Sequence, residues 1–202
     1  MKIGIDFDNT IAQYDDIFHA TAHERGLLES DPGKNKTSVR DYLRKTGREK
    51  DWILLQGYVY GACMERITPF PGAQEFVRRA RATGHEVRIV SHKTRHANMG
   101  PKYDLHESAR LFLAKNGFVG EGGQGIDAND AYFEVTREAK LARIVSEGCD
   151  VFIDDLPELL TSHDFPPSVR RYLFDPNGVH APSTDYTVLT SWFDAIDRLI
   201  ER

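Results

Sequence analysis

This 202-residue sequence has few of the features that mark secreted, membrane-bound or nucleic-acid-binding proteins. It has only two cysteines, Cys63 and Cys149, and their spacing matches no metal or redox motif. No stretch approaches the roughly 18 apolar residues that a membrane-spanning helix needs. No basic segment followed by an apolar one opens the chain. We therefore expect a cytoplasmic protein with reduced, buried thiols and no membrane partner.

Long runs of one charge are also absent. The net charge is −5, from 26 basic and 31 acidic residues spread along the chain. Without a basic stripe, we expect no groove for a nucleic acid polymer. The glycines from Gly117 to Gly125 do not form the pattern of a dinucleotide-binding loop. What remains is an ordinary globular composition, 40% hydrophobic and 28% charged, with enough chain for a sizeable core.

The first ten residues carry the most informative signal. The apolar run Ile3-Gly4-Ile5 predicts a short buried strand, and Asp-Phe-Asp-Asn-Thr follows it at once. In an open parallel sheet, ligands bind at the edge where such strands end. Two carboxylates as close as Asp6 and Asp8 repel each other unless a proton or a cation lies between them, and oxygen ligands suit Mg²⁺. The pattern indicates a metal-assisted carboxylate site.

Strand and helix patterns alternate along most of the chain. Strands are expected over 86–90, 131–135, 149–153 and 171–174, and helices over 73–82, 105–115, 136–145 and 187–200. This alternation predicts βαβ units and therefore an α/β fold, a Rossmann-like, mostly parallel sheet flanked by helices. Three helical stretches without a strand pattern fill 14–68: 15–25, a second capped by Thr37 or Ser38, and 51–64. We expect a core of residues 1–13 and 69–202, with 14–68 as a small helical insertion.

Four motifs that follow strands or open a helix resemble those of the haloacid dehalogenase (HAD) superfamily. They are Asp-Phe-Asp-Asn-Thr at 6–10, Ile-Val-Ser at 89–91, Lys140 in Thr-Arg-Glu-Ala-Lys, and Val-Phe-Ile-Asp-Asp at 151–155. Each alone has an ordinary explanation, such as a solvated turn or a helix cap. All four in order span essentially the whole chain. The insertion at 14–68 is similar to the helical cap that this superfamily often places between its first and second motifs.

The resemblance implies a role for each residue of the first three motifs. Asp6 is expected to be the nucleophile that forms an aspartyl-phosphate. Asp8 is expected to protonate the leaving alcohol and later to activate water. Ser91 Oγ and the backbone N–H of His92 are expected to hold phosphoryl oxygens. Lys140 is expected to neutralise charge between the nucleophile and the phosphoryl group.

The resemblance also implies Mg²⁺ as the cofactor. Its expected ligands are Asp6, the carbonyl of Asp8 and the acidic pair of the fourth motif. Asp154 is favoured as the direct ligand, and Asp155 is either a ligand or a neighbour of one. The cation would stabilise charge on the transferred group.

The predicted function is Mg²⁺-dependent hydrolysis of a small phosphate monoester, such as a sugar, polyol or amino-alcohol phosphate. A small cap can close over a small leaving group and exclude water. Two segments can reach the leaving group. One is the start of the insertion, with Tyr14 and Asp16. The other is the basic loop with His92, Lys93 and Arg95, where Lys93 or Arg95 would bind any second anionic group of the substrate. Without such a group, the loop is an ordinary solvated one.

Three alternatives stay open. A nucleotidase acting on nucleoside monophosphates has a similar layout, and Tyr14, Phe18, Trp52 and Tyr58 are candidates for stacking on a base, although helix packing explains them equally well. A phosphotransferase or mutase would use the same aspartyl-phosphate. A non-catalytic binding module is the third, but such a module needs no acid and base at Asp8.

Overall fold

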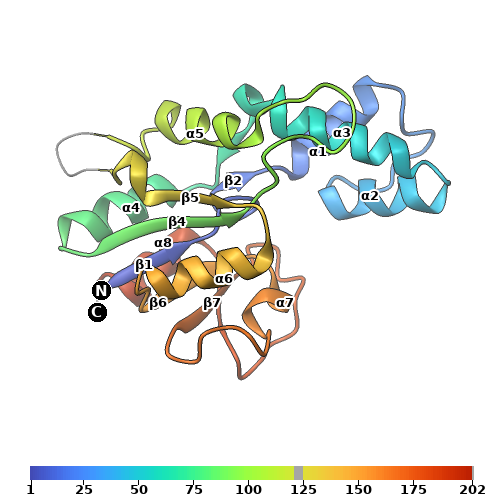
Figure 1. Cartoon of the computed structure of the whole chain (residues 1–202). Coiled ribbons are helices and arrows are strands. Elements are labelled where there is room, and N and C mark those ends of the chain that lie inside the picture. Colours follow the sequence, from blue (N-terminus) through green and yellow to red (C-terminus); the bar gives the residue numbers. More distant parts are fainter. Residues whose placement is uncertain (121–124, 202) are drawn as a thin grey trace.

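The computed structural model describes residues 1–120 and 125–201, so part of the glycine-rich stretch at 117–125 lies outside the described residues. A parallel sheet of six strands forms the centre of the fold (Figure 1). The strands are β1 (Lys2–Ile5), β4 (Glu86–His92), β5 (Ala131–Glu134), β6 (Val151–Asp154), β7 (Arg170–Phe174) and β8 (Thr187–Leu189). Their order across the sheet is β5-β4-β1-β6-β7-β8, and each neighbouring pair is parallel. The predicted α/β fold with a Rossmann-like sheet is confirmed.

Helices cover both faces of this sheet. On one face lie α6 (Arg137–Ser146) and α7 (Pro157–Leu160), and on the other lie α4 (Ala73–Ala82), α5 (Leu105–Lys115) and α8 (Trp192–Leu199). The central strand β1 shows why both faces are buried. Ile3 and Ile5 belong to the larger apolar cluster, while Gly4 faces Phe152 in the other cluster. A Cβ at Gly4 would lie 2.5 Å from a ring carbon of Phe152, so only glycine fits this close packing.

Three helices form a separate group between two very short strands. These are α1 (Asp15–Glu24), α2 (Lys36–Lys45) and α3 (Glu49–Gly61), followed by the 3₁₀ turn η1 (Met64–Arg66). The flanking strands β2 (Ala12–Gln13) and β3 (Thr68–Pro69) pair antiparallel. The sequence did not predict these strands, because two residues are too few to show an alternating pattern. We call α1 to α3 the helical wall, and Figure 1 shows it at the upper right, beyond one end of the sheet.

The interior of the helical wall is aromatic. Phe18 of α1 packs against Trp52 and Tyr60 of α3, with ring centroids 5.2 and 5.6 Å apart. Tyr14 lies edge-on to Tyr60 at 4.9 Å. Tyr14, Phe18 and Trp52, three of the four candidates for stacking on a base, therefore pack against other side chains. Helix packing accounts for them.

Two sequence-based boundaries were wrong. The second helix is capped by Asn35, whose side chain accepts a hydrogen bond from the N–H of Ser38 at 2.7 Å. The predicted caps, Thr37 and Ser38, therefore lie within its first turn. The helix expected over 187–200 is instead β8 followed by α8. Pairing with β7 makes the first three residues a strand, and Ser191 then caps the helix by accepting from the N–H of Asp194.

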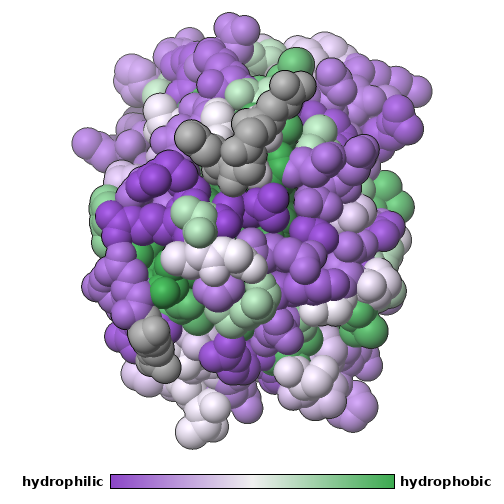
Figure 2. Space-filling view, turned by 90° about the vertical axis from the view of Figure 1, so that its left-hand side faces the viewer, coloured by the Kyte–Doolittle hydropathy of each residue, from purple (hydrophilic) through white to green (hydrophobic). Residues whose placement is uncertain are grey.

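None of the described helices is long and apolar enough to cross a membrane. The face of the molecule drawn in Figure 2 is mainly hydrophilic, and the hydrophobic residues visible there form small, separate patches. The apolar residues of the described chain are mostly inside the two clusters that sandwich the sheet.

Candidate active site

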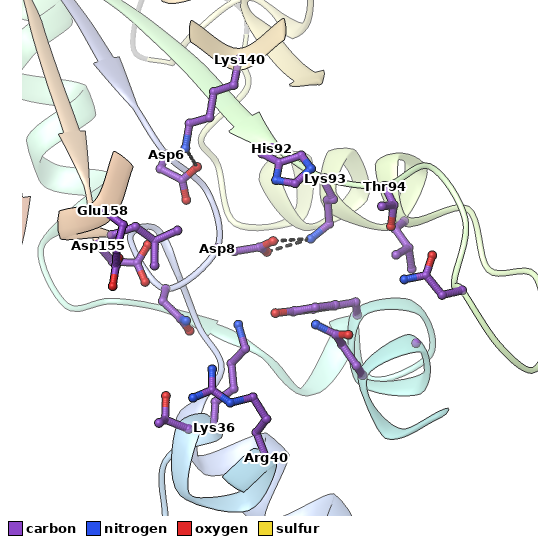
Figure 3. A pocket seen from close by; sticks show the side chains of 18 of the residues that line it. Asp6, Asp8, Lys36, Arg40, His92, Lys93, Thr94, Lys140, Asp155 and Glu158 are labelled. Carbon is purple, nitrogen blue, oxygen red and sulfur yellow. Dashed lines mark hydrogen bonds and ion pairs between the residues drawn. The ribbon is translucent and has the colours of Figure 1, made fainter. Parts of the chain in front are cut away.

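Three charged side chains meet at the carboxyl ends of β1 and β6. Asp6 follows β1, Asp154 ends the adjacent strand β6, and the N–H of Asp6 donates to the carbonyl of Ile153 at 2.9 Å. The Lys140 ammonium donates to Asp6 Oδ1, as Figure 3 shows, and to Asp154 Oδ2, at 2.6 Å each. All three side chains are buried. Residues that are far apart in the sequence thus form one buried ion-pair bridge.

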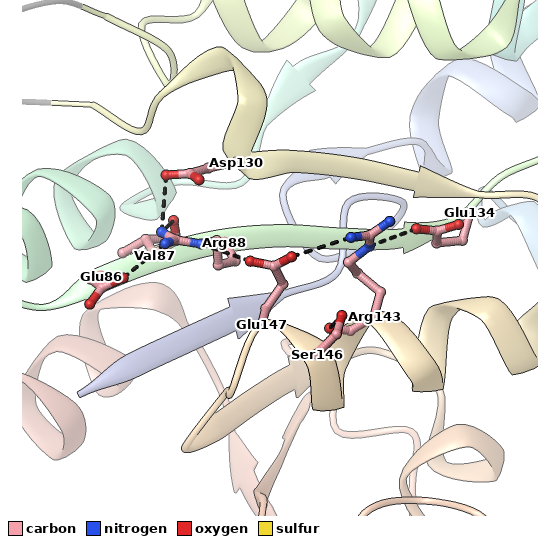
Figure 4. A network of polar contacts seen from close by, with 8 residues as sticks. All are labelled: Glu86, Val87, Arg88, Asp130, Glu134, Arg143, Ser146 and Glu147. Carbon is pink, nitrogen blue, oxygen red and sulfur yellow. Dashed lines mark hydrogen bonds and ion pairs between the residues drawn. The ribbon is translucent and has the colours of Figure 1, made fainter.

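The placement of Lys140 depends on α6. Thr136 caps this helix, as predicted, by accepting from the N–H of Ala139 at 3.1 Å. Further along the helix, Arg143 donates to Glu134 of β5 at 2.9 Å and to Glu147 at 3.3 Å (Figure 4). Glu147 in turn accepts from Arg88 of β4. This network holds α6 against the sheet, and the helix in turn places Lys140 at the strand ends.

The acidic groups at this edge carry strong mutual repulsion. Burial raises the pKa of Asp6 to about 7, and although Lys140 lowers it, Asp154 and Asp8 add to the increase. Burial also raises the pKa of Asp155, helped by the charges of Asp154 and Asp6. Burial opposes the charge on Lys140, but the two carboxylates that it contacts outweigh burial and raise its pKa. The site therefore holds more negative charge than one lysine neutralises.

Asp6, Asp154 and Asp155 fit the requirements of a hard cation. Each can place one carboxylate oxygen so that the three oxygens lie within 4.8 Å of one another. Asp154 already accepts from Lys140 and, at 2.9 Å, from the N–H of Leu156. Asp155 is less buried and lines the adjacent cavity. A cation bound to this set of oxygen donors would relieve the repulsion that helps to raise the pKa values of Asp6 and Asp155.

Asp8 lies on the other side of the loop that follows β1. Asn9 turns the chain with a φ of 56°, a left-handed conformation that asparagine tolerates better than most residues. The Lys93 ammonium contacts both oxygens of Asp8, at 2.7 and 2.8 Å. Lys93 is itself buried, and its backbone is held by Glu134 and His106. Asp6 and Asp8 therefore face the same cavity with different lysine partners.

Ser91 occupies β4 beside this edge. Its hydroxyl is buried and has no hydrogen-bond partner among the described residues. Leaving a buried hydroxyl unpaired costs about 1–3 kcal/mol, so this oxygen is one that a ligand would satisfy. Ser91 does not line the cavity directly, whereas its neighbour His92 does.

A cavity of about 570 Å³ lies between the strand ends and the helical wall. The sheet side contributes Asp6, Asp8, Lys93, Lys140 and Asp155. The opposite side is formed by residues of α2 and α3 that the sequence did not single out: Lys36, Thr37, Arg40, Ile53, Gln56, Gly57 and Tyr60. The only sequence signal for the charged pair is that Lys36 and Arg40 are four residues apart, and charged residues at this spacing are common on surface helices.

The close approach of α3 explains how these residues reach the cavity. A Cβ at Gly57 would lie 2.8 Å from Ala97 Cβ, and one at Gly61 would overlap the ring of Tyr103. Two glycines one turn apart on α3 thus allow the helix to pack directly against the loop that follows β4.

Three predicted substrate-binding residues are not brought to the cavity, and these predictions are corrected here. Tyr14 is fully buried in the helical wall, and its hydroxyl contacts Met64 Sδ at 3.8 Å. Asp16 is exposed on α1. The side chain of Arg95 is 67% exposed and pairs with Asp104 at 3.3 Å, although Thr94 and Ala97 of the same loop line the cavity. None of the three is among the residues that line the cavity.

No protein-family model matches the sequence, and no curated protein matches it. Solved structures do match. A HAD family hydrolase from Deinococcus radiodurans R1, crystallised with bound phosphate and sodium, superposes with a TM-score of 0.60 at 18% identity, covering 99% of this chain and 95% of its own. A phosphoserine phosphohydrolase-like protein from Francisella tularensis gives 0.56 at 12% identity, covering 98% and 100%. This chain has the HAD fold.

A HAD-superfamily hydrolase from Geobacter sulfurreducens gives the same result, with a TM-score of 0.56 at 14% identity over 98% of this chain and 95% of its own. The HAD fold predicted from the four motifs is therefore confirmed. At these identities the likeness concerns the fold, and the chemistry of the site depends on the residues of this chain.

Proposed function

We propose that this protein is a Mg²⁺-dependent phosphatase that hydrolyses a small phosphate monoester through an aspartyl-phosphate on Asp6. The observation that carries the proposal is the buried Lys140 bridge between Asp6 and Asp154, beside a cavity that Asp8 also faces. A carboxylate nucleophile, a second carboxylate for proton transfer and a fixed cation are the groups that this chemistry requires.

The reaction has two steps on the residues of this chain. First, an Asp6 oxygen bonds to phosphorus while the bond from phosphorus to the leaving oxygen breaks, and Asp8 gives that oxygen a proton. Then Asp8, now a carboxylate, takes a proton from water as the water oxygen attacks phosphorus, which releases phosphate and restores Asp6. Lys140 stays beside Asp6 and offsets the negative charge of the phosphoryl group. Ser91 Oγ supplies a hydrogen bond that no described residue uses.

Lys93 positions Asp8 for both steps. Its ammonium contacts both Asp8 oxygens, at 2.7 and 2.8 Å, and so fixes the orientation of this carboxyl group at the edge of the cavity.

Mg²⁺ is the cofactor we propose, held by Asp6 and the pair at the end of β6, and when bound it would stabilise charge on the transferred group. We now favour Asp155 as the ligand of that pair that faces the substrate. Asp154 accepts hydrogen bonds on both oxygens, while Asp155 lines the cavity.

Residues 14–68, which contain the helical wall, are proposed as the cap that encloses the leaving group. A cavity of about 570 Å³ suits a substrate the size of a sugar phosphate. A nucleotide is less well supported, because Tyr14, Phe18 and Trp52 pack inside the wall and Tyr58 lies outside the cavity lining, under the Arg25 guanidinium.

The test is a panel of phosphate monoesters assayed for free phosphate with Mg²⁺ and with EDTA. We expect phosphate release that EDTA abolishes and added Mg²⁺ restores, with Ca²⁺ a poor substitute because its coordination is larger and looser. Full activity in EDTA would remove the metal from the proposal. Transfer of phosphate to a second organic product, with no free phosphate, would identify a phosphotransferase. Binding without turnover of any monoester would identify a binding module.

A further inference from the structure

The cavity holds positive charge that the proposed reaction does not use. Four lysine or arginine side chains from the described residues line it. Two are neutralised by the protein: Lys140 by Asp6 and Asp154, and Lys93 by both oxygens of Asp8. The other two, Lys36 and Arg40, come from α2, on the side of the cavity opposite the strand ends (Figure 3).

Neither of these two groups forms an ion pair with a carboxylate that lines the described cavity. The Lys36 ammonium makes no ion pair with any described residue, and the centroid of the Tyr60 ring lies 5.5 Å from it. Among the described residues, Arg40 pairs only with the Asp41 carboxylate, at the surface, through Nε at 2.8 Å. The ends of its guanidinium have no carboxylate partner in the described chain, although this fork is suited to a carboxylate or a phosphate.

Lys36 and Arg40 place two positive charges close together on one side of the cavity. Lys36 and Arg40 are four residues apart on α2, and like charges at this spacing repel each other. Burial alone would lower the pKa of Lys36, but the Tyr60 oxygen and the carboxylates of Asp8 and Asp155 outweigh burial and raise it. Lys36 therefore remains charged beside Arg40, and an anion between them would relieve the repulsion.

Neutral polar groups complete this end of the cavity. Thr37 and Gln56 lie beside the two cations on the helical wall, and Asn98 projects from the loop after β4. A hydroxyl and two amides of this kind suit the hydroxyl groups of a polyhydroxylated ligand.

Resting on the proposed phosphatase activity, we infer that the substrate carries a second anionic group, a carboxylate or a second phosphate, which Lys36 and Arg40 bind on the leaving-group side. The substrate class is then a phosphorylated sugar acid or a sugar bisphosphate. This moves the second-anion site from Lys93 and Arg95 of the basic loop to α2, because Lys93 is occupied by Asp8 and Arg95 points to solvent.

Matched substrate pairs test the inference. Phosphogluconate and sorbitol phosphate differ by a carboxylate, and fructose bisphosphate and fructose monophosphate differ by a phosphate. Hydrogen bonds to charged groups lead us to expect the wild-type kcat/KM to be at least about tenfold higher for the doubly anionic member of one pair. The pair that shows the preference identifies the anion. A wild-type protein that hydrolyses an aryl phosphate but prefers neither doubly anionic substrate would overturn the inference and leave the phosphatase proposal intact.

The variants Lys36→Met and Arg40→Gln assign the preference to α2. Each is expected to lower the ratio of kcat/KM between the preferred pair by about tenfold or more, mainly through KM. Arg44→Gln and Lys45→Met are matched controls one turn further along the same helix, outside the cavity lining, and should keep the ratio. An unchanged ratio in both cavity variants would contradict the inference.

A binding measurement decides the case in which no monoester is turned over. Calorimetric titration of the Asp6→Asn protein with phosphogluconate and with fructose bisphosphate should show binding that Lys36→Met weakens about tenfold. Equal affinity in the Asp6→Asn protein with and without Lys36→Met would overturn the inference. Equal affinity of the Asp6→Asn protein for the singly and the doubly anionic member of each substrate pair would also overturn it, and neither result depends on activity.

Discussion

The sheet side of the cavity and its helical wall differ in how they handle charge. On the sheet side, carboxylates and lysines pair with one another: Lys140 with Asp6 and Asp154, and Lys93 with Asp8. On the helical wall, Lys36 has no ion pair among the described residues, and Arg40 has only a surface one. In the proposed function, the paired side would meet the phosphoryl group that all phosphate esters share, and the unpaired side would meet the particular leaving group.

The two sides also differ in how they are joined to the rest of the molecule. The sheet side rests on central strands buried on both faces, and the network of Arg88, Glu147 and Arg143 supports the helix that carries Lys140. The helical wall meets the rest of the molecule through the β2–β3 pair and through the contact of α3 with the loop after β4. In the proposed function, we therefore expect substrate selection to be sensitive to how the helical wall docks, and the positions of Asp6 and Lys140 to be less so.

The largest effect on folding is expected from removing a cation from the sheet side. Lys140→Met leaves two buried carboxylates without their partner, and breaking such a buried pair costs about 3–5 kcal/mol. Chemical denaturation in EDTA measures the loss. Lys93→Met is the control, because Asp8 is 20% exposed and water can solvate it. It should cost less than Lys140→Met, because only one carboxylate, and a partly exposed one, loses its partner. Equal losses would show that the two ion pairs are equally buried in solution.

A second effect concerns the link between protons and metal. The pKa of Asp6 is raised from 3.8 to about 7, and that of Asp155 is also raised. Between pH 3.8 and about pH 7, the folded protein therefore binds more protons than the unfolded chain. The metal-free protein thus loses stability as the pH rises through this window. Because Mg²⁺ binds the deprotonated carboxylates, its stabilisation should grow from about pH 5.5 to about pH 8.

Thermal unfolding with and without Mg²⁺ at the two pH values measures this difference. Asp16→Asn, an exposed carboxylate outside the site, should leave the pH dependence as it is. A Mg²⁺-induced increase in Tm that is the same at both pH values would show that these carboxylates do not bind the metal.

The smallest effect is expected at the contact that docks the helical wall. Gly61→Ala places a methyl group against the Tyr103 ring and should push α3 away from the loop after β4. The gain in helix propensity, about 1 kcal/mol, offsets part of the lost packing, so stability should change little. KM for the preferred substrate should rise several-fold, measured against Ala62→Ser, an exposed neighbour. An unchanged KM would mean that this contact does not set the position of the wall.

The sequence predicted the sheet side well, for a physical reason. Asp6, Asp8 and Asp154 follow apolar strands, and parallel strands bring their carboxyl ends to one edge, so neighbours in space can be read from the order of strands. Lys140 was predicted only from the resemblance of Thr-Arg-Glu-Ala-Lys to a HAD motif, since a lysine within a helix is otherwise ordinary. The positions of the three aspartates depend on local patterns and on the general rules of α/β sheets.

The helical wall could not be predicted in the same way. Lys36 and Arg40 look like any surface lysine and arginine until the docking of α2 and α3 is known. That docking depends on the contacts of Gly57 with Ala97 and of Gly61 with Tyr103, which are far apart in the sequence. The prediction for Arg95 failed for the opposite reason. Arg95 is near Ser91 in the sequence, but its side chain points to solvent.

The proposed covalent role of Asp6 is tested most directly by a burst experiment with the Asp8→Asn variant and an aryl phosphate. Nitrophenolate is a good leaving group that needs little help from an acid, so the first step should proceed, whereas the second step lacks its base. We predict a burst of about one nitrophenolate per protein without matching phosphate release, because the phosphate stays bound to Asp6. The burst should be absent when Asp6→Asn is added. Nitrophenolate and phosphate appearing together at all times, or a burst that persists in the variant that also carries Asp6→Asn, would contradict it.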